Sequence, residues 1–179
     1  MEHPTLALSR ALDYAARRHA DQRRKGASAK PYINHLAEVA HLLAEATGGE
    51  DTNLVIAGLL HDAIEDTGAT KGDIEKAFGA DVASLVVAVT DDKSLPKAER
   101  KRRQVENAPG KTGRAKMLKI ADKTSNLRDI AADPPADWPA ERKREYVDWA
   151  GLVVEGCRGI NSGLEQRFDA ARKAALKTV

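Results

Sequence analysis

The sequence is poor in several features that mark common protein classes. Cys157 is the single cysteine among 179 residues, which excludes a disulfide framework and a cysteine-rich zinc site. No apolar run approaches the ~20 residues that a transmembrane helix needs. Residues 1–20 form an amphipathic pattern with charged groups, and they lack the apolar core and small-residue cleavage site of a signal peptide. We therefore expect a cytoplasmic protein that does not contact membranes.

Aromatic residues are also scarce, and neither sign of charge is in large excess. Only 4% of the residues are aromatic, and 29 basic residues nearly balance 27 acidic ones, for a net charge of +2. Dedicated nucleic-acid binders usually carry a clear basic excess, so we expect no nucleic-acid partner, although residues 97–103 (KAERKRR) form a local basic run. The length and the 42% hydrophobic content are typical of a single domain with one core.

Apolar residues recur at helical spacing along most of the chain, which predicts an all-α fold. A β-strand at residues 84–89 (SLVVAV) is the alternative for that segment, because Val is β-branched. We favour a helix there because the helical spacing continues upstream. We expect Gly79 to interrupt this helix, a proline-rich loop at 133–139, and a break near 156–163. The predicted helical segments are 8–19, 33–43, 50–66, 74–89, 96–107, 114–132 and 141–176.

The segment LLHDAIEDTG, residues 59–68, ends an apolar run in groups that bind metals or protons: His61, Asp62, Glu65, Asp66 and Thr67. On a helix, residues four apart share a face, so we expect His61 to lie above Glu65 and Asp62 above Asp66. Burying such groups without a partner is costly. Imidazole nitrogens and carboxylate oxygens are suitable ligands for Mn, Fe, Zn and similar divalent ions, and such an ion would remove that cost.

Two other helical segments carry matching ligands. His35 lies in PYINH, and Asp122 lies in KIADKTSN, with Asn126 one turn further on. Two histidines and two aspartates from three helices would leave open positions on a metal for water and substrate. Such an ion lowers the pKa of bound water and creates a nucleophile at neutral pH. Glu65 and Asp66 are then placed to orient this water or to move protons.

Each of these segments also has a purely structural interpretation. The His61–Asp62 pair could be a surface or cap pair, Asp122 could pair with Lys123, and His35 could be a hydrogen-bonded core histidine. EDTG could simply end a helix. What favours a metal site is the order His, His-Asp, Asp on helices, with two further carboxylates beyond the His-Asp pair. The remaining histidines, His3, His19 and His41, are assigned structural roles.

The same order of residues resembles the HD-domain metal phosphohydrolases. The similarity is most specific to the hydrolase domain of the Rel/SpoT enzymes, and in particular to the small alarmone hydrolases of the metazoan SpoT-homologue type. It covers residues 6–156 and implies a single HD domain over 1–179, with eight to ten helices around a metal site. The segments that carry it are QRRKG, PYINHLAEVA, GLLHDAIEDTGAT, VTDDKSLPKAERKRRQ, AKMLKIADKTSNLRDI and YVDWAGLVVEG.

The resemblance implies an activity and a set of site residues. The activity is removal of the 3′-pyrophosphate from ppGpp or pppGpp, which gives GDP or GTP and pyrophosphate, with one bound Mn²⁺. Glu65 and Asp66 would be the catalytic carboxylates. The implied metal ligands are His35, His61, Asp62 and Asp122, and the implied nucleotide contacts are Arg24, Lys25, Asn126 and Tyr146.

The charge of this substrate suits the basic run that follows the metal segments. A pyrophosphate monoester is highly anionic and needs Lys and Arg near the metal. We expect a mobile basic flap to supply them, with Lys93 and Lys97 in contact with substrate and Arg100 and Lys101 beside them. A solvated helix, with Lys97 and Glu99 as surface charges, is the alternative.

Two positions leave the details of substrate binding open. Tyr146 could stack on the guanine or pack in the core. Gly26 stands where an Asp often follows the Arg-x-Lys pair, so we expect the geometry of this loop and the substrate preference to differ, with the metal site untouched.

Other functions remain compatible with the sequence. The same metal site could serve an NADPH 2′-phosphatase or another nucleotide phosphohydrolase. A nucleotide sensor without catalysis would lose a ligand or a carboxylate, and none is missing. A nucleic-acid module on residues 97–103 would bind in a salt-dependent manner, but aromatic residues do not interleave with the basic run. The sequence fixes neither the native metal nor the oligomeric state.

Overall fold

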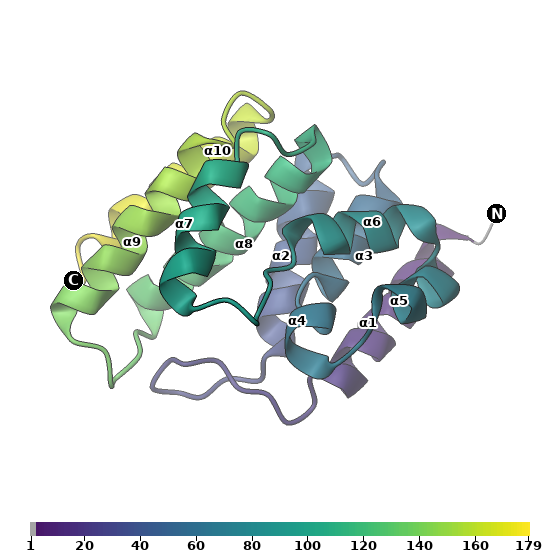
Figure 1. Cartoon of the computed structure of the whole chain (residues 1–179), viewed down its shortest axis with the longest axis horizontal. Helices are drawn as coiled ribbons and strands as arrows, with labels where there is room; N and C mark the ends of the chain where they lie inside the picture. Colours follow the sequence, from purple (N-terminus) through teal and green to yellow (C-terminus); the bar gives the residue numbers. More distant parts are fainter. Residues whose placement is uncertain (1–2) are drawn as a thin grey trace.

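The computed structural model describes residues 3–179 and consists of helices joined by loops, the longest of which covers residues 19–32 (Figure 1). Within this part of the chain the structure has no β-strand, only one isolated bridge between Arg23 and Pro31. The predicted all-α class and the expected number of helices are therefore confirmed. The helices are α1 (Pro4–Arg18), α2 (Ile33–Ala46), α3 (Thr52–Leu60), α4 (Ala63–Thr67), α5 (Lys71–Phe78), α6 (Ala80–Val89), α7 (Lys97–Asn107), α8 (Gly113–Ala132), α9 (Ala140–Glu155) and α10 (Ser162–Ala175).

Polar side chains fix where several helices begin. The side chain of Asp51 accepts a hydrogen bond from the backbone amide of Leu54 at the start of α3. Thr70 and Asp73 form a capping box at the start of α5, and Thr112 caps α8. Each of these caps satisfies amides that have no partner inside the helix.

Glycine separates α5 from α6 where the sequence predicts an interruption. Gly79 has φ 91°, a conformation that side-chain-bearing residues rarely adopt. The segment that follows, residues 80–89, is helical, so the β-strand alternative for 84–89 is wrong. The predicted break near 156–163 is confirmed, because α9 ends at Glu155 and α10 begins at Ser162.

The predicted single helix over residues 50–66 is wrong in one respect. The chain leaves the helix after Leu60 and resumes it at Ala63, so His61 and Asp62 lie in a turn between α3 and α4. The imidazole Nδ1 of His61 lies 2.8 Å from the carbonyl oxygen of Gly58, which fixes the ring against the last turn of α3. His61 and Asp62 therefore do not belong to one continuous helix face with Glu65 and Asp66.

Helix α8 is the centre of the fold. It packs against α10, α2, α9, α6 and α3, and Figure 1 shows α9 and α10 on one side of it and α2 and α3 on the other. Leu118, Ile120 and Leu127 on α8 are fully buried, and burial of each contributes about 1.5–3 kcal/mol. The buried apolar residues form one continuous core.

Helix α3 is the most enclosed element, because every residue from Leu54 to Leu60 is buried. It approaches α2 closely at Gly58, where an added Cβ would lie 2.8 Å from Leu43 Cδ1. The three packed helices α2, α3 and α8 therefore form the rigid base that carries the predicted metal-binding segments. No helix in the described part of the chain is long and apolar enough to cross a membrane.

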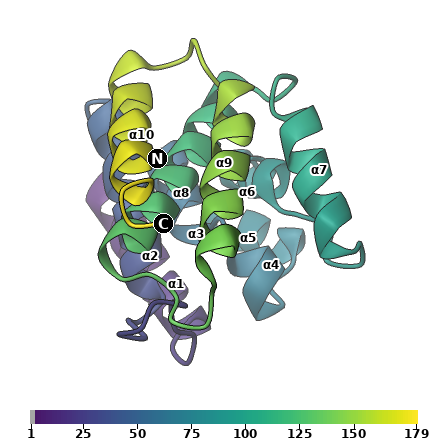
Figure 2. The same ribbon diagram turned by 90° about the vertical axis from the view of Figure 1, so that its left-hand side faces the viewer.

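Helix α7 differs from the others because it has no buried residue. It stands at the edge of the molecule in Figure 2, and it packs against α9. The indole Nε1 of Trp149 on α9 donates a hydrogen bond to the carbonyl oxygen of Lys101, at 3.0 Å. The basic run thus forms a surface helix held by a few contacts.

Candidate active site

The predicted metal ligands come together at the junction of α2, α3 and α8. The Nε2 atoms of His35 and His61 lie 3.3 Å apart. Asp62 Oδ2 lies 3.1 Å from His61 Nε2 and 3.7 Å from His35 Nε2. Asp122 Oδ1 lies 3.4 Å from His35 Nε2 and 3.8 Å from His61 Nε2. His35, His61 and Asp62 each offer a ligand atom within 4.8 Å of the others.

The outer nitrogens of both histidines face hydrogen-bond acceptors. His61 Nδ1 faces the carbonyl oxygen of Gly58 and must donate to it. The Ser125 hydroxyl donates to Glu38, at 2.6 Å, so its oxygen accepts from His35 Nδ1, at 2.9 Å. With a proton on each Nδ1 in the neutral rings, each Nε2 atom carries a lone pair. These lone pairs face each other and the carboxylates of Asp62 and Asp122. This is the arrangement in which imidazoles bind a metal.

The electrostatics of the cluster show a need for positive charge. Burial lowers the pKa of His61, but the carboxylates of Asp62 and Asp122 outweigh it and raise that pKa to about 10. Burial opposes ionisation of Asp122, yet Lys123 and the two histidines hold its pKa well below its usual range. A proton between these groups balances the charge when no ion is present, and a divalent cation would balance it more completely.

Neighbouring side chains orient the two carboxylates. The Tyr32 hydroxyl donates to Asp62 Oδ2, at 2.7 Å. Asn126 Nδ2 donates to Asp122 Oδ1 at 2.7 Å, and Lys123 Nζ donates to Asp122 Oδ2 at 2.9 Å. Contacts of this kind fix the direction of ligand lone pairs. The sequence did not identify Tyr32 as a partner, because no local pattern states which distant residue it meets. From the sequence, pairing of Asp122 with Lys123 is an alternative to metal binding, and the structure shows that pair inside the cluster.

Glu65 lies on α4, next to the cluster. Its Oε2 accepts a hydrogen bond from the backbone amide of Asp91, at 3.2 Å, and Arg100 Nη1 lies 3.7 Å from its Oε1. Burial raises the pKa of Glu65, the Asp91 amide opposes this shift, and the charge of Asp62 adds to it. A carboxyl group with a raised pKa is suited to proton transfer near neutral pH.

Asp66 makes different contacts from its neighbour Glu65. It pairs with Lys93 and accepts a hydrogen bond from Gln22 Nε2, at 2.9 Å. Lys93, predicted to contact the substrate, therefore lies against a predicted catalytic carboxylate. Asp66 and Lys93 both line a pocket that opens beside the cluster.

Two connected pockets surround these residues. The inner pocket has a volume of about 150 Å³ and is lined by His61, Asp62, Asp122 and Glu65, among others. The outer pocket has a volume of about 430 Å³ and opens beside it. The two share four lining residues, namely Tyr32, Glu65, Asp66 and Asn126. A ligand in the outer pocket can therefore extend one end into the inner one.

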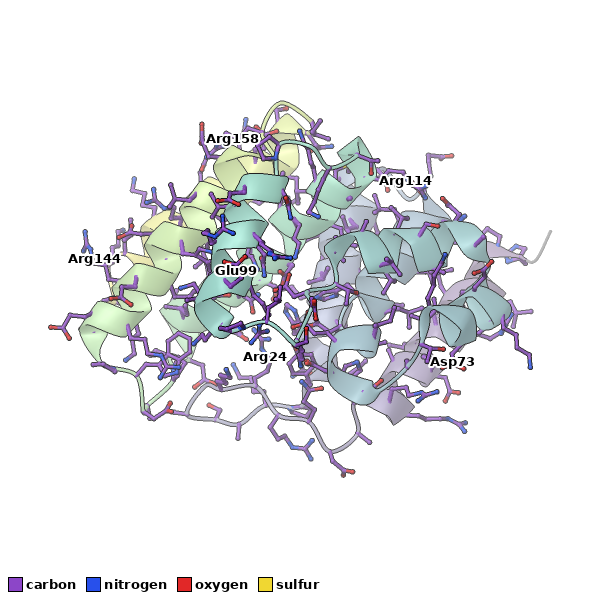
Figure 3. The ribbon with its side chains drawn as sticks, in the orientation of Figure 1. Arg24, Asp73, Glu99, Arg114, Arg144 and Arg158 are labelled. Carbon is purple, nitrogen blue, oxygen red and sulfur yellow. The ribbon has the colours of Figure 1, made fainter. Side chains whose placement is uncertain are left out.

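Arg24 lies at the wall of the outer pocket, near the middle of the view in Figure 3. Its Nε donates to Asp129 at 2.6 Å, and its Nη2 donates to Asn126 Oδ1 at 2.8 Å. The guanidinium also lies over the Tyr32 ring, 5.4 Å from the centroid. Arg24 and Asn126, both predicted to contact the nucleotide, thus also connect the loop before α2 to the metal-binding helix.

Aromatic rings form the far wall of the outer pocket. Tyr146 lies between Trp138 and Trp149, with ring centroids 5.8 Å and 5.3 Å away. Tyr146 and Trp138 line the pocket, and exposed Lys25 lies 5.8 Å from the centroid of Trp138. Tyr146 therefore packs against other rings and also faces the pocket, so neither sequence interpretation applies alone.

Cations gather beside these rings. Arg142 on α9 lies 4.2 Å from the centroid of Trp138. Partial burial lowers the pKa of Lys97, and the charges of Arg142, Lys25 and Arg100 lower it further. Within residues 3–179, neither Lys97 nor Arg142 has a carboxylate at ion-pair distance, and Lys97 does not line either pocket. Trp138 was not predicted as a site residue, because residues 133–139 carry only the signal of a loop. Arg142 was not predicted either, because nothing distinguishes it from the other charged residues at the start of its helix.

The basic helix α7 has two faces. Glu99, labelled in Figure 3, pairs with Arg102 and Arg103 on the outer face, as expected for a solvated helix. Arg100 and Lys101 lie on the side that faces the rest of the molecule, since Arg100 approaches Glu65 and Lys101 lies over Trp149. The solvated-helix interpretation therefore describes the outer face of α7. Contact of the inner-face cations with substrate stays a prediction.

The histidines assigned structural roles lie apart from the cluster. His3 caps α1 by accepting a hydrogen bond from Thr5, and His41 is exposed. His19 is buried, contacts Gln22 and stacks on Tyr32 at 5.3 Å between centroids. His19 thus supports the residue that orients Asp62.

Comparisons with known proteins agree with this geometry. An HD-domain family model matches residues 11–152. A relative from Drosophila melanogaster, named guanosine-3′,5′-bis(diphosphate) 3′-pyrophosphohydrolase MESH1, is 46% identical over 167 residues, which cover 93% of each chain. The human protein of the same name is 49% identical over 159 residues, or 89% of each chain.

A solved structure described as a metazoan orthologue of SpoT that hydrolyses ppGpp has the same fold, with a TM-score of 0.91. It is 44% identical to this chain, and the match covers 97% of both chains. The match to the HD-domain model spans all three helices of the metal-binding base. The chain belongs to the HD-domain family.

Proposed function

We propose that this protein hydrolyses ppGpp and pppGpp at the 3′-pyrophosphate, giving GDP or GTP and pyrophosphate. The observation that carries the proposal is the joined pair of pockets, in which a cluster of metal ligands opens directly onto a wall of cations and aromatic rings. A nucleotide with a pyrophosphate on its ribose has the matching parts. The similarity to hydrolases of this activity supports the same substrate.

The HD domain implies a divalent metal, and the residues of the cluster fit one. Two buried imidazole nitrogens and two carboxylates converge there, and the raised pKa of His61 shows that the carboxylates favour a positive charge at this point. When bound, such an ion activates water and polarises phosphoryl oxygens. We propose Mn²⁺, as the family resemblance implies, within a donor set that also suits Fe²⁺ and Zn²⁺. The ligands would be His35, His61, Asp62 and Asp122.

Glu65 and Asp66 are the proposed catalytic carboxylates. Glu65, with its raised pKa, would take a proton from the attacking water and return it to the leaving oxygen. Asp66 would hold Lys93 at the boundary of the two pockets, where an ammonium group can neutralise charge on the phosphates. The Asp91 amide and Arg100 keep Glu65 directed toward the inner pocket.

The outer pocket would hold the rest of the nucleotide. Lys25, Lys97 and Arg142 provide positive charge, and no carboxylate of the described residues lies at ion-pair distance from them. Tyr146 provides a ring face or edge for the base. Arg24 and Asn126 lie between the metal base and this pocket. We assign them a double role, in which they support the site and present their remaining donors to the nucleotide.

The first experiment offers ppGpp and NADPH separately to the purified, Mn²⁺-loaded protein and identifies the products. GDP and pyrophosphate from ppGpp, abolished by a chelator, are the expected result. Inorganic phosphate and NADH from NADPH, with ppGpp untouched, would overturn the alarmone proposal and retain the metal site. Metal analysis of protein purified without added metal identifies the native ion.

We also propose that this chemistry takes place in the cytoplasm, on a small-molecule substrate. The single cysteine, Cys157, is buried and unpaired, and this supports a reducing compartment. Fractionation of cells that produce the protein tests the location. Recovery with the membrane or extracellular fraction would contradict it.

A further inference from the structure

One side of α8 carries a row of polar residues that runs from the metal cluster to the end of the helix. Asp122, Asn126 and Asp129 follow one another at helical spacing. Asp122 belongs to the cluster, while Asn126 and Asp129 hold Arg24. Asp133 continues the row as the C-cap residue of α8. Neither the metal chemistry nor the binding roles proposed above use Asp133.

Asp133 holds the loop that carries Lys25. Its Oδ1 accepts hydrogen bonds from the backbone amide and the hydroxyl of Ser28, both at 3.1 Å. Lys30 Nζ lies 3.8 Å from its Oδ2. The side chain of Asp133 is only 10% exposed, so these contacts are sheltered from water and the carboxylate is effectively held in one place.

Gly26 allows this contact to form. An added Cβ at Gly26 would lie 2.4 Å from both the backbone oxygen and Oδ2 of Asp133. Gly26 is not among the glycines with positive φ, so its backbone does not require glycine. The reason for glycine here is the close approach of the loop to the end of α8. The two ends of the loop are joined by a hydrogen bond from the backbone amide of Arg24 to the carbonyl oxygen of Lys30, at 2.8 Å.

We infer that Asp133 is a positioning residue that holds the loop of residues 24–30 against α8, so that Lys25 stands beside Trp138 at the outer pocket. Gly26 is the partner that makes this contact sterically possible. The inference rests on the proposed function, because it assigns Lys25 to the binding of an anionic substrate. It adds a determinant of affinity that is not itself a substrate contact.

The charge of Asp133 separates two possible roles of this residue, because they predict opposite changes in KM. Asp133 lines the outer pocket, and a carboxylate there repels an anionic substrate. If Asp133 acted only through its charge, its removal would lower KM for ppGpp. If it acts by holding the loop, loss of its hydrogen bonds raises KM. The two roles therefore predict changes of opposite sign.

The decisive variants are Asp133→Ala and Asp133→Asn. Asparagine removes the charge but keeps an oxygen that accepts from Ser28, so KM should equal or fall below that of the wild type. Alanine removes both the charge and the accepting oxygen. KM should then rise about tenfold, with kcat and metal content unchanged. Asp137→Ala, an exposed charge in the same connection, is the matched control and should leave KM unchanged. A lower KM in Asp133→Ala would overturn the inference.

Gly26→Ala tests the steric half of the inference. The added methyl group meets backbone as well as side-chain atoms of Asp133, so the loop must move away and KM should rise as in Asp133→Ala. Gly72→Ala is the matched control, because its Cβ would meet nothing closer than 3.7 Å. An unchanged KM in Gly26→Ala would contradict the close approach.

Amide hydrogen exchange without substrate separates this inference from the proposed function. The Ser28 amide should exchange at least about tenfold faster in Asp133→Ala than in the wild type, and at the wild-type rate in Asp133→Asn. Equal Ser28 exchange in all three proteins would overturn the inference, whatever the substrate is. Failure of the wild type to cleave ppGpp would instead overturn the proposed function, and the exchange rates would still decide whether Asp133 holds the loop.

Discussion

The inner cluster and the outer pocket are electrostatically incomplete in opposite ways. Two carboxylates and two imidazole lone pairs converge in the inner cluster, around a point that needs positive charge. Beside the outer pocket, Lys97 and Arg142 gather near Lys25, and within the part of the chain that the structure describes no carboxylate lies at ion-pair distance from either. A cation completes the first region and a polyanion completes the second. The proposed function uses this difference, because it places a metal and a highly phosphorylated nucleotide together in one site.

The two regions also differ in how they are built. The inner cluster rests on packed helices, one of which, α3, is buried from Leu54 to its last residue, Leu60. The outer pocket is lined mainly by two loops, residues 22–26 and 133–138, and by the last turns of α8. Helices α7 and α9 contribute one residue each, and α7 buries no residue. We therefore expect changes in the inner region to alter metal content and turnover, and changes in the outer region to alter substrate affinity.

The largest effect should come from Asp62→Ala. This change removes a ligand charge, so metal and activity should be lost together. The loss of turnover should exceed the ~10²–10⁴-fold typical of a missing acid–base group, because the chemistry that the ion supplies disappears. Elemental analysis of the purified variant and a turnover assay measure both. Retention of a full metal complement would remove Asp62 from the ligand set.

Glu65→Ala should separate proton transfer from metal binding. Its carboxylate is placed to move protons, so kcat should fall about 10²–10⁴-fold while most of the metal remains. Asp62→Ala serves as the comparison in the same metal analysis. If Glu65→Ala lost its metal as completely, the division between ligand and acid–base roles would be wrong.

Ser125→Ala should weaken the inner region without removing a ligand. It deletes the hydroxyl that accepts from His35 Nδ1 and donates to Glu38. Loss of such a supporting contact typically lowers metal affinity about 10–100-fold. Metal titration of the stripped protein measures the change, and turnover at saturating metal should stay near that of the wild type. An unchanged metal affinity would show that His35 is oriented without Ser125.

The smallest effect should come from Arg142→Ala, which removes a cation over Trp138 beside the outer pocket. Loss of one charged hydrogen-bonding group should raise KM for ppGpp roughly tenfold, with metal content and kcat unchanged. Arg144, two residues along α9 and at the periphery in Figure 3, provides the matched control Arg144→Ala, which should leave KM unaltered. Equal KM values for the two variants would contradict the expectation that changes in the outer region alter substrate affinity.

The sequence predicts the helices well because burial imposes a period on each of them. It also names four residues from α2, α8 and the turn after α3 that the structure brings within a few ångströms of one another. The break at His61 and Asp62 was not predictable in this way. The apolar pattern passes through it, and the turn depends on a hydrogen bond from the imidazole to Gly58.

The outer pocket was harder to predict, because its residues belong to loops and to exposed helix faces. Nothing in the local sequence around Trp138 or Arg142 indicates that they return to the loop of Lys25. Asn126 was expected to contact the nucleotide, and the structure shows its amide between Asp122 and Arg24. Only the three-dimensional arrangement shows such shared use of one side chain.

The row of polar residues on α8 has a consequence for how this chain can change in length. Asp122 and Asp129 lie on one helix, seven residues or about two turns apart, which fixes the span between metal and loop anchor at about 10 Å. One inserted residue between them would turn Asp129 away by about 100° and shift it by about 1.5 Å. Insertions after Asp133, at residues 134–137, would move neither the metal ligands nor Asp129 and Asp133, so the tolerance for added residues should change abruptly just beyond the end of α8.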